Sequence, residues 1–285
     1  MGHAGMLKRW SDAEVRPKTV LITGASRGIG EATARLFLDK GWSVAATMRT
    51  PEASQLRPSN QLKVYQMDVA SPVSITDGIA TAIEDFGRID VVVNNAGHCI
   101  VGALEELSDD DLQAVLDTNI LGAMRVTRAA LPHMRACGGG RIVNVSSMCG
   151  QMTLPLYTAY CASKWGLEGF SESLAFETRA HGIRVKIVEP GVHKTGSFTS
   201  QLADHAARPA HSSYSGFSAR VLPRLGAFER SAPPAGDVAH TIYKAATDRW
   251  PRLRYPVGSH AVLFARRLIP SSLYVRAVRR VLGAW

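Results

Sequence analysis

The sequence lacks the patterns of a disulfide-stapled, zinc-binding or membrane-spanning protein. Its four cysteines show no C-x-x-C spacing and its nine histidines no paired ligand spacing, so we predict no disulfide framework and no metal site. The apolar runs are far shorter than the roughly 18 to 20 residues that cross a bilayer, and the N-terminus has no signal-peptide core. We therefore expect a soluble, cytoplasmic protein.

Acidic residues are missing from the end of the chain. The net charge is +9, and residues 249–285 contain eight arginines but no Asp, Glu or Lys, so the preceding residues carry only about +1 (9 minus 8). Nucleic-acid binding through this basic segment would need interleaved aromatic residues or a recognition motif, and neither is present. We do not expect a nucleic-acid partner.

The length of 285 residues and a hydrophobic content of 46% favour one α/β domain over two small ones. We predict a flexible extension over 1–17, a dinucleotide-binding and catalytic domain over 18–258, and a basic amphipathic tail over 259–285. Within the domain, 197–236 is rich in Ala, Ser, His and Pro with weak periodicity. We interpret it as a substrate lid containing short helices.

The tail carries an apolar stripe on one side of an expected helix, with arginines elsewhere on it. The stripe comprises Leu273, Ala277, Val278, Val281 and Leu282. Packing against its own domain or a partner subunit is the favoured interpretation, and peripheral contact with a membrane surface is the less favoured one.

A glycine turn follows the first expected strand, Thr19–Thr23. In the run Thr23-Gly-Ala-Ser-Arg-Gly-Ile-Gly30, Gly24 and Gly28 permit a tight or positive-φ backbone, and Gly30 lets the following helix approach the strand. The N–H groups at the helix start can then face a pyrophosphate. Such a turn alone can also be an ordinary strand-to-helix connection, but here a strand and a helix flank it as phosphate binding requires.

The end of the second expected strand, Ser43–Thr47, has no carboxylate to bind the adenine ribose 2′-hydroxyl of NAD. It offers Arg49 instead, and the glycine turn offers Arg27. Two guanidiniums suit a 2′-phosphate, so we predict a preference for NADP(H) over NAD(H). The alternative is that both arginines are solvated surface charges.

Two further loops follow expected strands at the edge where ligands bind in doubly wound sheets. Asp68-Val69 follows the strand Leu62–Met67 and could meet an adenine edge, although Asp68 could equally be a loop acid. Asn94-Asn-Ala-Gly97 follows Ile89–Val93, and we expect it both to form a turn and to contact the cofactor.

Ser108 has the character of a helix N-cap and opens a long expected helix containing Asn119, which we expect Pro132 to bend or end. Asparagine is disfavoured inside a helix unless its side chain or the local backbone has another task. Asn119 is therefore a candidate site residue.

Tyr160 and Lys164 lie four residues apart, so on a helix they share one face. A fixed positive charge favours the phenolate and is expected to lower the pKa of Tyr160, which could then give or take a proton. Ser147, at the end of the expected strand Arg141-Ile-Val-Asn-Val145, could orient a substrate oxygen beside it.

Taken in order, these motifs resemble the short-chain dehydrogenase/reductase family over about residues 18–258. Residues 97–108, 131–135 and 254–258 are similar to its 17β-hydroxysteroid dehydrogenase-like branch. The resemblance implies a single-domain Rossmann-like three-layer sandwich with a central parallel sheet of about seven strands, assembled as a homodimer or homotetramer.

The resemblance also implies the site. Tyr160 would be the proton donor in reduction, Lys164 would lower its pKa and bind the nicotinamide ribose, Ser147 would orient the carbonyl, and Asn119 would hold a relay water. The expected cofactor-binding residues are Thr23, Gly24, Ser26, Arg27, Gly28, Ile29, Gly30, Arg49, Asp68, Val69, Asn95, Ala96, Gly97, Tyr160, Lys164, Pro190, Gly191, Val192 and Thr195. The expected substrate-binding residues are Ser147, Cys149, Tyr160 and His193.

These expectations define an NADP(H)-dependent oxidoreductase that transfers a hydride between nicotinamide and a carbonyl or secondary alcohol. We expect a medium-sized hydrophobic substrate and reduction of a ketone. The alternative is a non-catalytic NADP(H)-binding regulatory or scaffold protein.

Overall fold

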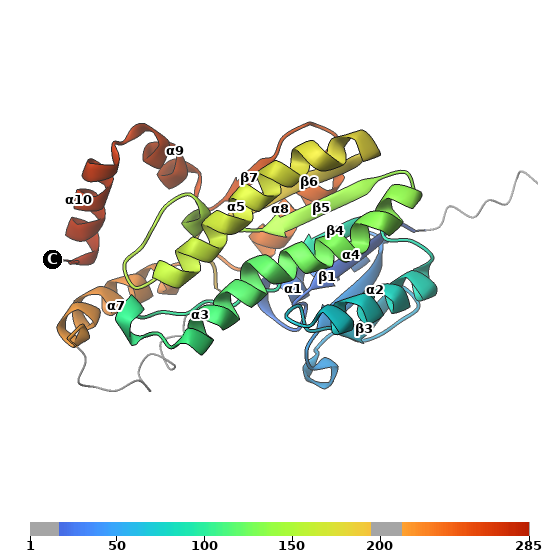
Figure 1. The fold of residues 1–285 in the computed structure, drawn as a ribbon, viewed down its shortest axis with the longest axis horizontal. Coiled ribbons are helices and arrows are strands. Elements are labelled where there is room, and N and C mark those ends of the chain that lie inside the picture. Colours follow the sequence, from blue (N-terminus) through green and yellow to red (C-terminus); the bar gives the residue numbers. More distant parts are fainter. Residues whose placement is uncertain (1–16, 195–212, 285) are drawn as a thin grey trace, which may run out of the picture.

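A seven-stranded parallel sheet forms the centre of the molecule (Figure 1). The computed structural model describes residues 17–194 and 213–284. The strand order is β3-β2-β1-β4-β5-β6-β7, so the direction of winding reverses between β1 and β4. The strands are β1 Thr19–Thr23, β2 Ser43–Met48, β3 Leu62–Gln66, β4 Val91–Asn94, β5 Gly140–Val145, β6 Ile183–Pro190 and β7 Arg254–Val257.

Helices cover both faces of this sheet (Figure 1). One face packs against α1 (Gly28–Asp39) and α8 (Gly236–Thr247), and the other against α2 (Pro72–Phe86), α4 (Ala123–Ala136) and α5 (Thr158–Thr178). The predicted single-domain Rossmann-like fold with seven parallel strands is confirmed.

The central strands are apolar throughout because neither of their faces meets water. Along β1, Val20 and Ile22 belong to the core on the α1 and α8 side, whereas Leu21 belongs to the opposite core. All three are fully buried. This explains why the sequence shows short continuous apolar runs rather than alternation.

Buried amides tie the carboxyl ends of the central strands to the helices. The Asn94 Nδ2 atom donates to Asn144 Oδ1 at 2.8 Å and to Thr127 Oγ1 at 3.0 Å. Asn144 Nδ2 in turn donates to Ser171 Oγ at 2.7 Å. Since buried polar groups must be paired, this chain of bonds sets how β4, β5, α4 and α5 pack.

The expected long helix from Ser108 is a continuous helical segment in three parts. It consists of α3 (Asp109–Leu116), a π-helical stretch over Asp117–Gly122 that contains Asn119, and α4. Of the two expected effects of Pro132, ending the helix was wrong, because α4 continues to Ala136. The irregularity lies at Asn119 instead.

The C-terminal part of the chain forms a small lobe beside the sheet (Figure 1). It contains α7 (Ser215–Arg230), α9 (His260–Leu268) and α10 (Ser271–Leu282). Residues 213–235 of the expected lid contain one helix of 16 residues, α7. Residues 197–212 of the lid and 1–16 of the expected extension lie outside the described residues. Across the described ranges, no helix is long and apolar enough to cross a membrane.

The tail packs on its own domain. This is one of the two forms of packing, against its own domain or a partner subunit, that the apolar stripe favoured. On α10, Tyr274 and Leu282 are buried, and the Tyr274 hydroxyl donates to the Thr153 carbonyl in the loop before α5. Leu273 and Val281 are nevertheless 49% and 60% exposed, so the tail is only partly covered.

We predict that Asn144→Ala destabilises the fold by about 1–3 kcal/mol, because it removes one of the two hydrogen bonds of the buried Asn94 Nδ2 and the one that Ser171 Oγ accepts. Urea unfolding followed by circular dichroism would measure this loss. Asn60→Ala, at an exposed position, is the matched control and should leave the midpoint unchanged. Equal midpoints for the two variants would contradict the structural role of the amide chain.

Candidate active site

One cavity of about 1010 Å³ runs along the carboxyl ends of the central strands. It starts at the glycine turn after β1, passes the loops after β2, β3, β4 and β5, and ends between the helices of the C-terminal lobe. This is the edge at which the winding of the sheet reverses, and ligands of such sheets bind there. The cavity therefore defines the candidate site.

The glycine turn has the geometry that its sequence predicted. Gly24 and Gly28 adopt φ values of +66° and +60°, which glycine reaches without strain. A Cβ atom added to Gly30 would lie 2.5 Å from the Asn95 amide nitrogen and would also strike the Gly24 carbonyl. Only glycine fits there, and the start of α1 can thus approach the loop after β4.

Thr23 and Asn95 support the turn from below. The Thr23 hydroxyl accepts from the backbone N–H groups of Asn95 and Ala96, both at 3.0 Å. The Asn95 side chain donates to the carbonyls of Thr23 and Gly24 at 2.9 and 3.0 Å. Thr23 is 1% exposed and does not line the cavity, so it acts on the turn and not on a ligand.

Arg27, Arg49, Asp68 and Val69 line the end of the cavity farthest from the C-terminal lobe. Neither guanidinium forms an ion pair with any described residue, and both residues are exposed. Asp68 Oδ1 accepts from the Ala70 backbone N–H at 2.9 Å, so this carboxylate also shapes its own turn. A group with negative charge would meet two available cations here.

Tyr160, Ser147 and Lys164 converge in the middle of the cavity. The Ser147 hydroxyl is hydrogen-bonded to the Tyr160 phenol. The Lys164 Nζ atom donates to the Val145 carbonyl at the end of β5 at 2.9 Å and lies 5.8 Å from the centre of the Tyr160 ring. Helix α5 supplies Tyr160 and Lys164 from successive turns of one face, as predicted.

Burial is the main influence on the pKa of the Tyr160 phenol. Burial raises the pKa of Tyr160 well above its usual value, and the hydrogen bond from Ser147 lowers it only in part. Burial also lowers the pKa of Lys164 to about 8. Desolvation is the largest effect on this group, so the Tyr160 phenol is neutral at neutral pH and carries its proton.

Asn119 lies beside this group but does not line the cavity. Its Nδ2 atom donates to the His98 carbonyl at 2.7 Å and to Ser163 Oγ at 2.9 Å, and its Oδ1 atom accepts from the His98 N–H at 2.7 Å. The side chain is therefore fully used in joining the loop after β4 to α5. Both polar atoms of the Asn119 side chain therefore already have partners, and neither is available to bind the expected relay water.

His193 and Cys149, the expected substrate contacts, both line the cavity. His193 Nδ1 lies 3.1 Å from the Gly191 carbonyl, which makes this nitrogen the donor and leaves Nε2 as a bare acceptor. Nε2 is buried and has no partner among the described residues. Cys149 is buried, and its hydrogen bond with Cys161, together with burial, raises the pKa of the Cys149 thiol.

The C-terminal lobe provides part of the cavity wall: α7 lies in the expected substrate lid, whereas the contribution of α9 and α10 was not predicted from the sequence. These side chains come from three helices of the lobe and are mostly apolar, and their positions in sequence give no sign of a shared cavity. They are Leu225, Phe228 and Glu229 of α7, Val262, Ala265 and Arg266 of α9, and Tyr274, Ala277, Val278, Val281 and Leu282 of α10. The apolar stripe was the one available signal, and it could not reveal its partner.

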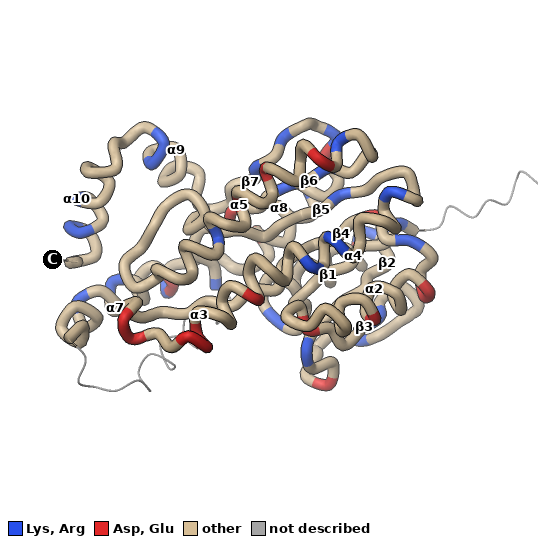
Figure 2. The backbone as a smooth tube through the Cα atoms, viewed as in Figure 1, with Lys and Arg blue, Asp and Glu red and all other residues tan. Residues whose placement is uncertain are grey.

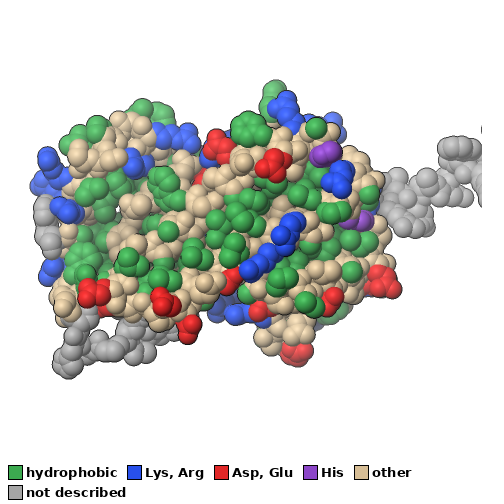
Figure 3. Space-filling model, viewed as in Figure 1, with side chains coloured by type: hydrophobic (Ala, Val, Ile, Leu, Met, Phe, Trp, Pro, Cys, Tyr) green, Lys and Arg blue, Asp and Glu red, His purple; other side chains and the backbone are tan. Residues whose placement is uncertain are grey.

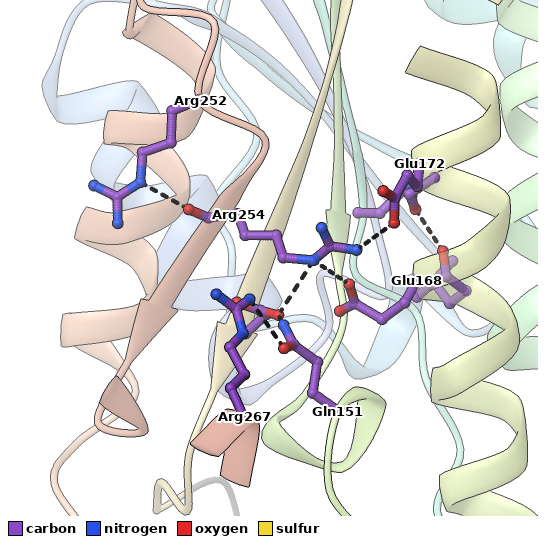
Figure 4. A network of polar contacts seen from close by, with 10 residues as sticks. Gln151, Glu168, Glu172, Arg252, Arg254 and Arg267 are labelled. Carbon is purple, nitrogen blue, oxygen red and sulfur yellow. Dashed lines mark hydrogen bonds and ion pairs between the residues drawn. The ribbon is translucent and has the colours of Figure 1, made fainter. Parts of the chain in front are cut away.

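A network of charged side chains links this lobe to the catalytic helix (Figure 4). Arg254 on β7 donates to Glu168 Oε2 at 3.0 Å and to Glu172 Oε2 at 2.9 Å, both on α5. Its Nε atom also lies 3.8 Å from Glu189 Oε1 on β6. Glu168 follows Lys164 by one helical turn, so Arg254 compensates a buried carboxylate close to the buried ammonium.

The network continues to the tail. Gln151, in the loop after Ser147, donates to Glu189, and Arg267 on α9 donates to Gln151 Oε1 at 3.1 Å. Glu189 is 1% exposed, and burial, with repulsion from Glu168, raises its pKa to about 7 despite the attraction of Arg254. The loop carrying Ser147 is thus fixed on the side opposite the cavity.

The structure brings most of the predicted site residues together around one cavity. Thr23 and Asn119 lie behind its wall, and Thr195 lies outside the described residues. The lining residues among those predicted are Gly24, Ser26, Arg27, Gly28, Ile29, Gly30, Arg49, Asp68, Val69, Asn95, Ala96, Gly97, Ser147, Cys149, Tyr160, Lys164, Pro190, Gly191, Val192 and His193.

Comparisons with known proteins agree with this arrangement. A sequence model described as short chain dehydrogenase matches residues 18–206. The uncharacterized oxidoreductase YusZ of Bacillus subtilis is 34% identical over 280 residues, covering 93% of this chain and 98% of that protein. A 3-ketodihydrosphingosine reductase of Bacteroides thetaiotaomicron is 32% identical over 268 residues, covering 93% and 98%.

Solved structures show the same fold. A short-chain dehydrogenase from Streptomyces avermitilis superposes with a TM-score of 0.75 at 32% identity, covering 94% of this chain and 96% of that one. A short-chain dehydrogenase/reductase from Burkholderia phymatum in complex with NAD gives a TM-score of 0.76 at 24% identity, covering 91% and 95%.

A doubly wound sheet with this glycine turn defines a dinucleotide-binding oxidoreductase class. Within that class, the chain belongs to the short-chain dehydrogenase/reductase family, and it is an enzyme that uses a nicotinamide cofactor. The expected family is confirmed, whereas its 17β-hydroxysteroid dehydrogenase-like branch stays a prediction.

We predict that the wild type loses stability to unfolding as the pH rises from about 4.5 to 7, and that Glu189→Gln loses less over the same range. The folded-state pKa of Glu189 is raised to about 7, so its contribution is fully present below the unfolded pKa and is lost as the pH rises through 7. Over this pH range, the free energy of unfolding of the wild type should fall by up to about 3 kcal/mol more than that of the variant.

Thermal unfolding of both proteins across this pH range would measure the difference. Glu52→Gln, at an exposed position, is the control and should follow the wild type. A Glu189→Gln curve parallel to the wild-type curve would show that Glu189 titrates normally in the fold.

Proposed function

We propose that this enzyme is an NADP(H)-dependent reductase that converts a ketone on a medium-sized hydrophobic molecule to a secondary alcohol. The observation that carries the proposal is the half-buried phenol of Tyr160, whose pKa is raised by desolvation, beside Lys164 inside a cavity whose far end offers two arginines. Proton donation to a developing alkoxide needs a phenol in this form.

The bound nicotinamide would supply the hydride, and the residues of this chain would do the rest. Tyr160 would donate its hydroxyl proton to the carbonyl oxygen as that oxygen gains charge. Ser147, already hydrogen-bonded to the phenol, would donate to the same oxygen and so fix the carbonyl beside Tyr160. Lys164 would stabilise the phenolate that remains, because it stays close in a medium of low dielectric.

Asn119 would act as a positioning residue. Its side chain is fully hydrogen-bonded, so a water in the proton relay would have to bind its backbone carbonyl. The π-helical stretch Asp117–Gly122 favours this, because a π-turn shifts carbonyls out of the regular helical bonding pattern.

The preference for NADP(H) rests on Arg27 and Arg49. Both line the cavity beyond the glycine turn, and β2 ends at Met48 without a carboxylate. A 2′-phosphate would gain charge-assisted hydrogen bonds from the two guanidiniums, whereas the ribose of NAD would find no acidic acceptor there.

The proposed hydrophobic substrate rests on the part of the cavity that lies between the helices of the C-terminal lobe, away from the glycine turn. Apolar side chains of α7, α9 and α10 surround that part, and His193 Nε2 offers an acceptor for one hydroxyl or N–H group. The relative named 3-ketodihydrosphingosine reductase supports a keto group on an apolar molecule. We further propose a homodimer or homotetramer formed through α5, which exposes 46% of Trp165 and 79% of Phe176.

We predict that Tyr160→Phe lowers kcat for ketone reduction by roughly 100-fold to 10,000-fold, the range that general acid catalysis supplies. Absorbance of reduced nicotinamide with a panel of ketones, aldehydes, quinones and steroids would measure turnover. NADPH affinity, measured by fluorescence titration, should stay close to that of wild type. Retained turnover in the variant would contradict the mechanism, and NADPH binding without turnover by wild type on any substrate would favour the regulatory or scaffold alternative.

We predict that the double variant Arg27→Gln, Arg49→Gln raises the KM for NADPH about tenfold or more, because it removes charge-assisted bonds to the 2′-phosphate. The KM for NADH should change little, since NADH lacks that phosphate. Arg57→Gln, at another exposed position, is the control. Equal affinity of wild type for both cofactors would refute the proposed preference.

A further inference from the structure

The C-terminal lobe exposes apolar side chains that the cavity does not account for. On α9, Phe264 and Leu268 are each 68% exposed, and on α10, Leu273 and Val275 are 49% and 45% exposed. None of the four lines the cavity. They lie on two short helices joined at Ile269-Pro270, so that Leu268 at the end of α9 and Leu273 near the start of α10 are close in sequence. Large apolar groups clustered at an outer edge mark an interaction surface.

The charges around these side chains have one sign. Arg276, Arg279 and Arg280 are exposed and form no ion pair with any described residue. The acidic stretches near the lobe lie at Leu104–Glu106 and the start of α3, away from α9 and α10, as Figure 2 shows, and Glu229 of α7 lines the cavity. The surface of α9 and α10 therefore presents positive charge that no neighbouring carboxylate neutralises.

Apolar and basic groups are interleaved on this surface. Figure 3 shows hydrophobic side chains over the lobe with Lys and Arg at its rim. A short helix with this pattern lies in the plane of a membrane interface, with its apolar side chains among the acyl chains and its arginines at the headgroups. We propose that α9 and α10 dock this enzyme peripherally on an anionic lipid membrane.

Other occupants match the surface less well. A second copy of this chain would bring its own arginines against Arg276, Arg279 and Arg280, and like charges repel. A nucleic acid would satisfy the arginines but offers nothing to the four apolar side chains. An anionic bilayer satisfies both sets of groups at once.

Docking through these helices places the cavity next to the lipid. On α10, Tyr274, Ala277 and Val278 line the cavity, whereas Leu273 and Val275 on the same helix face outward. A hydrophobic substrate could thus pass from the bilayer to the cavity along one helix. This last step rests on the proposed function, but the docking itself does not.

Co-sedimentation of the full-length protein with vesicles tests the proposal. We expect binding to vesicles of phosphatidylcholine mixed with phosphatidylserine, weak binding to phosphatidylcholine alone, and release by high salt. Leu268→Ser, Leu273→Ser and, separately, Arg279→Gln, Arg280→Gln should each weaken binding about tenfold or more.

Two matched controls separate this surface from general effects. Val73→Ser removes an apolar side chain that is 70% exposed on α2, and Lys40→Gln, Arg57→Gln removes two exposed charges near the glycine-turn half of the domain. Both should bind vesicles like the wild type. Circular dichroism and NADPH binding would show that each variant is folded, and these readouts keep a failure of docking distinct from a failure of the reductase activity.

Three outcomes would overturn the proposal. One is absence of binding to phosphatidylserine vesicles by the wild type. Another is binding that survives Leu268→Ser, Leu273→Ser and is lost only in the arginine variant, which would indicate a purely electrostatic polyanion site. The third is a change of oligomeric state in the leucine variant by analytical ultracentrifugation, which would show that a second copy of the chain covers this surface.

Discussion

The burial of the Lys164 ammonium beside the half-buried Tyr160 is the constraint on which the rest of the structure depends. An ammonium in such a place must be hydrogen-bonded, and Lys164 donates to the Val145 carbonyl at the end of β5. Desolvation also raises the pKa of the Tyr160 phenol and so keeps it protonated at neutral pH. The elements around this pair therefore have to place β5 and α5 accurately and keep solvent away from both.

Two polar systems meet that requirement from opposite sides. The amides of Asn94 and Asn144 join β4 and β5 to α4 and α5 within the layer below the cavity. Arg254 joins α5 to the last strands through Glu168 and the buried Glu189. Both systems are costly to bury unless complete, so they favour one relative placement of strands and helices.

The C-terminal lobe closes the same cavity with apolar surface. Helices α7, α9 and α10 give it walls that the sheet itself cannot provide, and Arg267 connects this lobe to the loop of Ser147 through Gln151. A short path of side chains therefore joins the lobe to the loop that carries Ser147. The part of the lobe facing away from the cavity remains available for an external partner.

The sequence by itself determined the elements whose signals are local. Short apolar runs, the glycine turn and the four-residue spacing of Tyr160 and Lys164 predicted the parallel sheet, the dinucleotide edge and the reacting group, because each depends on neighbouring residues. Only the tertiary structure decided what depends on distant segments meeting. It showed that burial governs the pKa of Tyr160, that the Asn119 side chain is occupied, and that the tail lines the cavity. These properties arise from desolvation and packing between residues far apart in the chain, which no local pattern encodes.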